Sequence, residues 1–133
     1  MQYSFSCIGH ENITAKHKTT LEFSKDKKVS LNGDCILGVE ADFDLPLVKE
    51  FIKSLKGNKI EIIIRINSIE EKINAEINPQ FNSNNELVIR KTDFVSERTF
   101  AIKADKSAAD LIRRFVKFIN ACKNRIDVVF LCR

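Results

Sequence analysis

The sequence has no apolar run long enough to cross a membrane. Its longest apolar stretch, Ile60–Ile66, is interrupted by charge and falls far short of the roughly 20 residues that a transmembrane helix needs. The first residues, Met1–Phe5, contain neither the basic start nor the apolar segment of a secretion signal. We therefore expect a cytoplasmic protein with no membrane association.

Common catalytic and nucleotide-binding motifs are missing as well. There is no GxGxxG, P-loop, GxSxG or HExxH motif, and no CxxC pair occurs among the four cysteines, Cys7, Cys35, Cys122 and Cys132. Each cysteine lies in an apolar strand or helix pattern, so we interpret them as small buried side chains. The cysteine spacing does not support a zinc or catalytic role, and no cofactor can be assigned.

The composition is that of an ordinary globular domain. The chain has 133 residues, of which 44% are hydrophobic and 30% charged, and this fits one domain over residues 1–133. The net charge of +4 is mild, and basic residues are interleaved with acidic ones almost everywhere. Such a surface allows nucleic-acid binding but does not require it.

Alternation and capping signals predict mostly strands with two helices. The first helix has Asp44 as N-cap, Pro46 in its first turn and Gly57 as a left-handed C-terminal residue. The second begins at the capping box of Ser107 and runs to about Cys122. After a mixed segment around Gly9, strands are expected at residues 19–23, 35–41, 60–67, 72–78, 86–90, 98–104 and 125–132.

The two halves of the chain, about 1–67 and 68–133, follow the same pattern. Asp42 and Asp105, which are 63 residues apart, each follow a strand and precede a helix and a final apolar strand. Upstream, the segments Glu11–Ala15 and Glu71–Ala75 align at a spacing of 60 residues. We interpret this as an internal duplication of a β-β-β-α-β unit. The alternative is a chance likeness between two sheet–helix–sheet units of hydrophobic residues.

Eight strands are too many for one flat layer packed on two helices. Closing the sheet or folding it on itself hides its edges. We therefore expect a mainly β (α+β) fold, a barrel- or sandwich-like sheet with two flanking helices. The Gly33–Asp34 turn also resembles the Gly-Asp box of cradle-loop barrels, although such a pair is common in turns.

A first group of polar residues surrounds the two histidines. A bulge could place His10 and His17 on one side of the sheet, where Glu22 and Asp34 would complete a cluster able to hold a metal or move a proton. The alternative is one exposed histidine and one hydrogen-bonded histidine at the margin of the sheet. No metal ligand set is assigned.

A second group follows the strand at residues 86–90. Arg90, Asp93, Arg98, Asp105 and Lys106 are clustered in sequence with several hydroxyl side chains. Two arginines beside such a loop could hold a phosphate or carboxylate. Alternatively, they form an internal ion-pair network that fixes the loop.

The second helix has a wide apolar band. Leu111, Phe115 and Phe118 form one stripe, and the adjacent stripe consists of Ile112, Val116 and Ile119. Because a helix on one sheet needs one apolar side, the second stripe suggests a partner, either the other helix or a second subunit in a homodimer. The basic residues Arg113, Arg114 and Lys117 on this helix are expected to be solvated. As an RNA-binding face they lack aromatic neighbours.

Several polar motifs together resemble a known archaeal family. These motifs are Gly9–Thr14, His17–Glu22, Gly33–Ile36, Val88–Lys91, Asp93–Val95, Arg98–Thr99 and Ala104–Lys106. The family is domain of unknown function 371, and the likeness covers nearly the whole chain. The resemblance implies an archaeal cytoplasmic protein with a mainly β fold, and it implies no activity.

We therefore expect a cytosolic binding module for an anionic small molecule or a macromolecular partner. The candidate polar site consists of His10, Asn12, His17, Glu22, Asp34, Arg90, Asp93, Arg98, Asp105 and Lys106. One alternative is an enzyme with a histidine general base and arginines that stabilise negative charge. The other is an RNA-associated or dimeric scaffold protein.

Overall fold

A computed structural model describes residues 1–121 and 123–133 of the chain. The prediction of a buried Cys122 at the end of the second helix therefore lies outside the described residues. The elements are β1 (Gln2–Ile8), β2 (Thr20–Ser24), β3 (Ile36–Gly38), α1 (Leu45–Ser54), β4 (Lys59–Ile66), β5 (Ile69–Ile77), β6 (Glu86–Arg90), β7 (Thr99–Ile102), the 3-10 helix η1 (Ala108–Asp110), α2 (Arg113–Asn120) and β8 (Arg125–Cys132).

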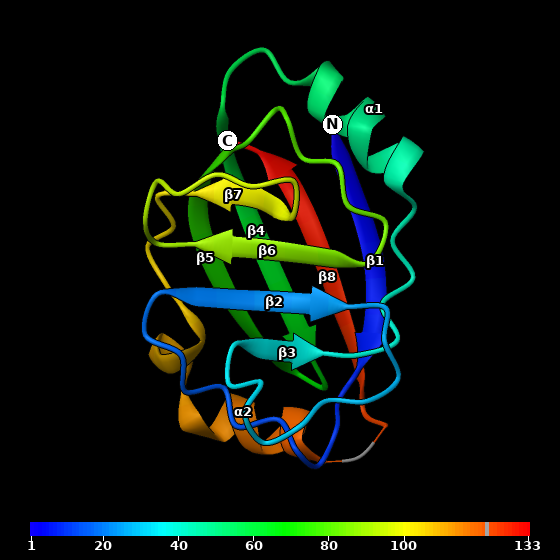
Figure 1. The fold of residues 1–133 in the computed structure, drawn as a ribbon, viewed down its shortest axis with the longest axis vertical. Helices are drawn as coiled ribbons and strands as arrows, with labels where there is room; N and C mark the ends of the chain where they lie inside the picture. Colours follow the sequence, from blue (N-terminus) through cyan, green and yellow to red (C-terminus); the bar gives the residue numbers. More distant parts are fainter. Residues whose placement is uncertain (122) are drawn as a thin grey trace.

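The expected mainly β fold is confirmed. All eight strands belong to one mixed sheet in the order β1-β8-β4-β5-β7-β6-β2-β3. The sheet folds on itself, so that β2, β3, β6 and β7 run across the steeper strands β1, β4, β5 and β8 (Figure 1). The two ends of the sheet meet at a single bridge between Ile8 and Val39, so the sheet is sandwich-like and not a closed barrel.

The core lies between the two layers of the folded sheet. In β8, Ile126, Val128 and Phe130 point inward and are fully buried, as expected for alternating positions of a half-buried strand. Phe130 stacks on Phe100 of β7, with the ring centroids 4.2 Å apart. Aromatic contacts of this kind join the layers and bury large apolar surfaces.

The first helix starts where the sequence predicts and ends earlier. The side chain of Asp44 accepts a hydrogen bond from the backbone N–H of Leu47, and Pro46 lies in the first turn. The helix then ends at Ser54 with Leu55 in an extended conformation. Gly57 has no positive φ, so the prediction of a left-handed C-terminal glycine was wrong.

The second helix differs more from its prediction. The capping box of Ser107 closes the 3-10 turn Ala108–Asp110, and α2 begins only at Arg113. Val116 is 8% exposed and Ile119 is fully buried, so the second apolar stripe is covered within the chain itself. Ile112 remains 60% exposed. The second apolar stripe therefore does not indicate a dimer through α2.

The three basic residues of α2 are exposed, and one of them is also hydrogen-bonded to the chain. Arg113 donates hydrogen bonds from its guanidinium group to the backbone carbonyls of Ala15, Ala108 and Leu111. This arginine therefore ties the start of α2 to two preceding loops. Arg114 and Lys117 are exposed, as expected.

The prediction that the cysteines are buried holds for one of the three described. Cys7 is buried, Cys35 is half-buried and Cys132 is exposed, and all three are free thiols. Among the described residues, no helix has the length and apolar character needed to cross a membrane.

Both halves of the chain have the element order β-β-β-α-β. The strands β1 to β4 correspond to β5 to β8 in the same order. When these counterparts are exchanged, each strand keeps equivalent neighbours, provided that the bridge between Ile8 and Val39 is counted as a contact between β1 and β3. For example, β2–β3 and β6–β7 are the parallel pairs of the sheet, and both have a shift of register. The pairing of β5 with β7 corresponds to the bridge between Ile8 and Val39.

Equivalent residues also make equivalent hydrogen bonds. The carboxylate of Asp42 accepts from the backbone N–H of Ser6 at 2.7 Å, and that of Asp105 accepts from the backbone N–H of Asn74 at 3.0 Å. The backbone N–H groups of both aspartates donate back to the carbonyls of the same partners, each at 3.0 Å. We infer from these matched contacts that the two halves are copies of one unit related by a pseudo-twofold axis.

The upstream alignment from the sequence is corrected by this geometry. Residues 11–15 form a loop, whereas residues 71–75 lie within β5, so the spacing of 60 does not join equivalent positions. The pairing of Ser6 with Asn74 gives a spacing of 68 residues instead. The sequence aligned these two segments because both contain Glu, Ile and Ala at the same relative positions.

Candidate functional site

His10 stabilises a turn. Its ring Nδ1 accepts a hydrogen bond from the backbone N–H of Asn12 at 3.0 Å. At the corresponding place in the second half, Oδ1 of Asn78 accepts from the backbone N–H of Gln80 at 3.1 Å. Since asparagine makes the same turn, the fold itself explains the contact of His10.

His17 has a similar role. Its Nδ1 accepts from the backbone N–H of Thr19 at 3.2 Å, and in the second half the hydroxyl of Ser83 accepts from the N–H of Asn85 at 3.4 Å. Among the described residues, no group of three His, Cys, Asp or Glu side chains is arranged to hold a metal ion. The histidines therefore do not form a metal cluster with Glu22 and Asp34.

Three other candidates lie in loops. The amide of Asn12 donates to the carbonyl of Val29 at 2.9 Å, which holds two loops together. The carbonyl of Asp34 accepts from the backbone N–H groups of Lys16 and His17. Asp93 is exposed on the loop between β6 and β7.

Asp105 and Lys106 have structural contacts away from the arginines. The carboxylate of Asp105 holds Asn74, as described above. Lys106 forms an ion pair at 2.9 Å with Glu71, whose side chain is 3% exposed. Glu71 also accepts from the backbone N–H of Ile112 at 2.7 Å, at the start of α2. Sequence reasoning missed this buried carboxylate because it began the strand at residue 72, whereas β5 begins at Ile69 and places Glu71 on the buried face with Ile73 and Ala75.

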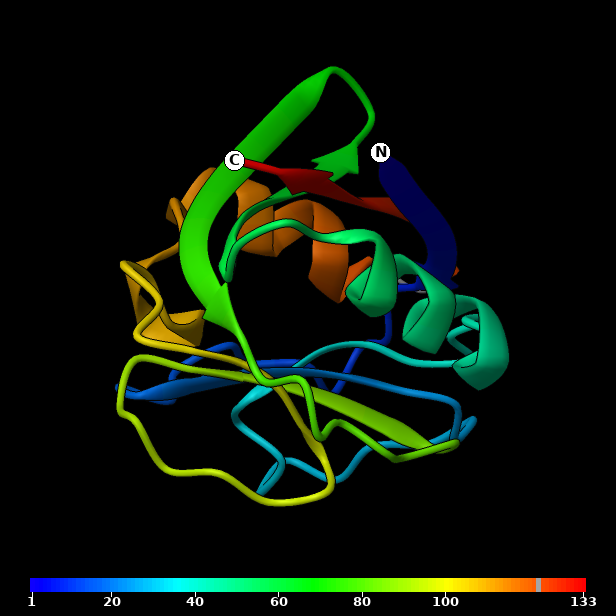
Figure 2. The ribbon, with the colours of Figure 1, turned by 90° about the horizontal axis from the view of Figure 1, so that it is seen from above.

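Glu22, Arg90 and Arg98 do converge, and Glu86 lies beside them. We call these four residues the axis cluster. Glu22 lies on β2, Glu86 and Arg90 lie at the two ends of β6, and Arg98 immediately precedes β7. They occupy the side of β2 and β6 that faces away from the core. Two loops flank this side, the first crossover (residues 25–35) and the second crossover (residues 91–98) (Figures 1 and 2).

The arginines of the axis cluster are bound to other groups than Glu22. Arg98 forms an ion pair with Glu86. Arg90 donates from Nε to the hydroxyl of Thr99 at 2.9 Å, and its guanidinium lies 4.9 Å from the ring centroid of Phe94. An arginine stacked on an aromatic ring keeps its outer N–H groups free to donate.

Glu22 is buried without an ion pair among the described residues. It is 8% exposed, and its closest polar contact is the Cys35 sulfur at 3.9 Å. Burial, with a contribution from the nearby charge of Glu86, raises the pKa of Glu22 to about 7, although Arg98 and Arg90 oppose this. The carboxyl therefore changes its charge near neutral pH.

The neighbours of Glu22 are perturbed in the same environment. Burial raises the pKa of Cys35 to about 11, with a further contribution from Glu22, so the thiol stays protonated. Burial and the adjacent charge of Arg98 lower the pKa of Arg90. Within the axis cluster Glu22 is thus the buried group, whereas the side chain of Arg98 is 52% exposed.

The two halves of the chain differ in charge at the axis cluster. Glu22 is paired directly with Val88 in the β2–β6 ladder, and the inferred duplication makes the two equivalent positions on either side of the pseudo-twofold axis. Their N–H groups donate to the carbonyls of Cys35 and Arg98, respectively, both at 2.9 Å. Thus Val88 is the uncharged counterpart of Glu22, and Cys35 is that of Arg98.

The other two charges follow the same rule. The ladder pairs Thr20 with Arg90 and Ser24 with Glu86, which makes Thr20 the counterpart of Glu86 and Ser24 the counterpart of Arg90. Each of the four charged residues therefore has an uncharged equivalent in the other half. The fold does not require charge at these positions, so the axis cluster is the leading candidate site.

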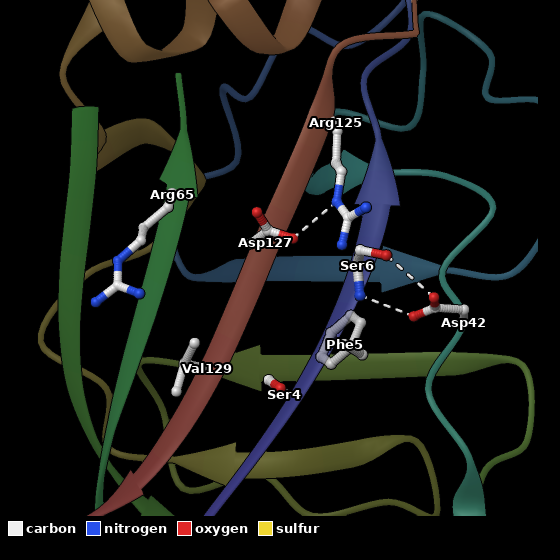
Figure 3. A pocket seen from close by; sticks show the side chains of 8 residues that line it. All are labelled: Ser4, Phe5, Ser6, Asp42, Arg65, Arg125, Asp127 and Val129. Carbon is white, nitrogen blue, oxygen red and sulfur yellow. Dashed lines mark hydrogen bonds and ion pairs between the residues drawn. The ribbon is translucent and has the colours of Figure 1, made fainter. Parts of the chain in front are cut away.

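A hollow lies elsewhere, on the outer side of β1, β8 and β4 (Figure 3). It measures about 460 Å³ and is lined by Ser4, Phe5, Ser6, Asp42, Arg65, Arg125, Asp127 and Val129. Its charges are already paired, because Arg125 contacts Asp127 at 3.0 Å and Arg65 contacts Glu70 at 2.8 Å. This open surface therefore offers no excess charge to a ligand.

The architecture and the site define a mainly β protein whose one mixed sheet positions a charged cluster, with a buried carboxyl group, between two crossovers. The chain belongs to the family described as domain of unknown function DUF371, whose model matches residues 5–132. It is also similar to an uncharacterised protein of the archaeon Methanocaldococcus jannaschii. The two are 35% identical over 130 residues, which cover 95% of this chain and 96% of the relative. The family resemblance of the polar motifs is thereby confirmed.

Proposed function

We propose that the protein is a cytosolic binding module whose axis cluster takes an oxyanion, such as the carboxylate or phosphate group of a small molecule. The observation that carries this proposal is the replacement of four uncharged counterparts by Glu22, Glu86, Arg90 and Arg98. Charges that a fold does not need are costly to bury, which favours a functional reason for them.

The charge of the axis cluster depends on Glu22. When Glu22 is ionised, two carboxylates balance two guanidinium groups. When Glu22 is protonated, the two arginines exceed the single carboxylate of Glu86. A protonated Glu22 can also donate a hydrogen bond to an anionic oxygen. The arginines would supply the charge-assisted hydrogen bonds that oxyanions prefer.

An enzymatic role with a histidine general base has less support. Nδ1 of both His10 and His17 accepts a backbone N–H in a turn, and asparagine or serine does the same in the other half. The group that changes its charge near neutral pH in this region is Glu22.

An NMR titration with inorganic sulfate tests the proposal. We expect sulfate to shift the backbone amide signals of Glu22, Val88 and Arg98, and we expect Arg98→Gln to abolish these shifts. Arg125→Gln is the matched control, because Arg125 is an exposed arginine in the hollow on the outer side of β1, β8 and β4. The proposal fails if Arg98→Gln leaves the response unchanged or if sulfate perturbs only residues outside β2, β6 and the two crossovers.

A further inference from the structure

The end of the molecule that carries α2 has five exposed lysines around two hollows. The first hollow, of about 240 Å³, is lined by Lys27, Lys28 and Lys123 together with His10. The second, of about 350 Å³, is lined by Lys16 and Lys117. We call Lys16, Lys27, Lys28, Lys117 and Lys123 the basic face.

One short segment joins the two hollows. Residues 8–10 line the first hollow and residues 13–16 contribute to the second. The amide of Asn120 donates to the carbonyls of Glu11 and Ile13, and the backbone N–H of His10 donates to the carbonyl of Ile119. The segment is thus fixed to α2, and the lysines on either side of it belong to one continuous surface.

The basic face is not neutralised by its own chain. Residues 111–126 contain five Lys and Arg residues and no Asp or Glu. Among the described residues, none of the five lysines of the basic face has a carboxylate within ion-pair distance. One acidic residue, Glu40, lines the first hollow. The five lysines therefore leave the basic face with an excess of positive charge.

We propose that the basic face binds the phosphate backbone of a nucleic acid. Regularly spaced phosphates match several lysines on one surface, and such contacts release condensed counterions. Phe94 is the exposed aromatic among the described large hydrophobic residues, and it lies on the second crossover and not on the basic face. Without aromatic side chains for base stacking, the contact is to the backbone and does not select a sequence.

Fluorescence anisotropy with a labelled oligouridine of about 20 nucleotides tests this inference. Five lysine–phosphate contacts predict an affinity loss of about 100-fold between roughly 50 and 200 mM salt. The triple variant Lys27→Gln/Lys28→Gln/Lys123→Gln should bind at least about tenfold more weakly and reduce the salt slope by about two. The double variant Lys16→Gln/Lys117→Gln should reduce the salt slope by a smaller amount. Arg113 is left unchanged because it supports the fold.

The matched control is Lys49→Gln/Lys53→Gln. These lysines line another hollow of about 390 Å³, beside α1. The inference is overturned if the control weakens binding as much as the triple variant, if the oligonucleotide is not retained at about 50 mM salt, or if the protein binds vesicles of anionic phospholipid and no oligonucleotide. A duplex DNA of the same length distinguishes single strands from duplexes as the preferred form. Sulfate binding at the axis cluster should be unaffected in all three lysine variants, so this inference can fail independently of the proposed function.

Discussion

At the scale of single residues, Glu22 differs from the buried Glu71 because its carboxyl group is buried without a cationic partner among the described residues. The side chain is 8% exposed and has no ion pair among the described residues. Its counterpart Val88 shows that a valine satisfies the packing of the same position. Selection for stability alone would favour the apolar residue.

The raised pKa of Glu22 predicts how stability depends on pH. Its pKa rises from the ordinary value of 4.5 to about 7 on folding, so the native state holds the proton more tightly than the unfolded state. The stability that this group contributes is complete below about pH 4.5 and is lost as the pH rises through about 7. Between about pH 4.5 and pH 7, we expect the free energy of unfolding of the wild type to fall by up to about 3 kcal/mol relative to that of Glu22→Gln.

Urea unfolding of both proteins at several pH values measures this difference. Other titrating groups are common to the two proteins and cancel in the comparison. Parallel stability curves for wild type and Glu22→Gln would contradict the assignment.

The sequence identified part of this site. Glu22 was predicted as part of a polar cluster with the histidines, and Arg90 and Arg98 were predicted as two arginines beside a loop that could hold an anion. The histidines were predicted from the chemistry of their side chains, but their turn contacts depend on backbone geometry that a sequence does not show. Glu86 was missed because it reads as an ordinary strand end.

At the scale of elements, the loop between β1 and β2 is packed closely on α2. Gly9 is buried, and a Cβ at this position would overlap the carbonyl oxygen of Ile119. The close approach allows the backbone of residues 9–13 to bond to Ile119 and Asn120. This glycine therefore positions the segment that joins the two hollows of the basic face.

We expect Gly9→Ala to destabilise the protein by about 1–3 kcal/mol, because the added methyl group meets backbone atoms that cannot rotate away. Gly57→Ala is the control, since a Cβ there has nothing within 4 Å. The control should be neutral or slightly stabilising. Thermal or urea unfolding measures both, and equal midpoints for Gly9→Ala and the wild type would refute the packing argument.

The elements themselves were largely predictable. The capping signals of Asp44 and Pro46 depend on neighbours within one turn, and the structure confirms them. The capping box of Ser107 was recognised correctly, yet it closes a 3-10 turn. The extended Leu111 and Ile112 then delay the α-helix, and their conformation depends on tertiary contacts such as that of Glu71.

At the scale of the whole molecule, the inferred pseudo-twofold axis relates β8 and β1 to the hairpin of β4 and β5. Both pairs are antiparallel, and the ends of the chain are adjacent, because the N–H of Cys132 donates to the carbonyl of Met1 at 3.5 Å. Joining the termini would therefore reproduce the turn at Asn67 and Ser68. The spacing of 63 residues was visible in the sequence, whereas the upstream spacing required the hydrogen-bond pattern.

This relation predicts that a circular permutant should fold. The permutant joins Arg133 to Met1 through one or two glycines and opens the chain between Asn67 and Ser68. We expect one cooperative unfolding transition and a circular dichroism spectrum like that of the wild type. A permutant that purifies only as an unfolded or aggregated chain would argue against equivalent hairpins.

The central claim is that the axis cluster binds an oxyanion when Glu22 is protonated. The most direct measurement is the sulfate affinity of the wild type and of Glu22→Gln at pH 6 and pH 8, since sulfate does not change its charge over this range. With a pKa of about 7 for Glu22, the wild type should bind sulfate about tenfold more weakly at pH 8 than at pH 6. Glu22→Gln should bind equally at both pH values, near the wild-type affinity at pH 6. A wild-type affinity that is independent of pH, or a Glu22→Gln protein that retains the tenfold dependence, would contradict the claim.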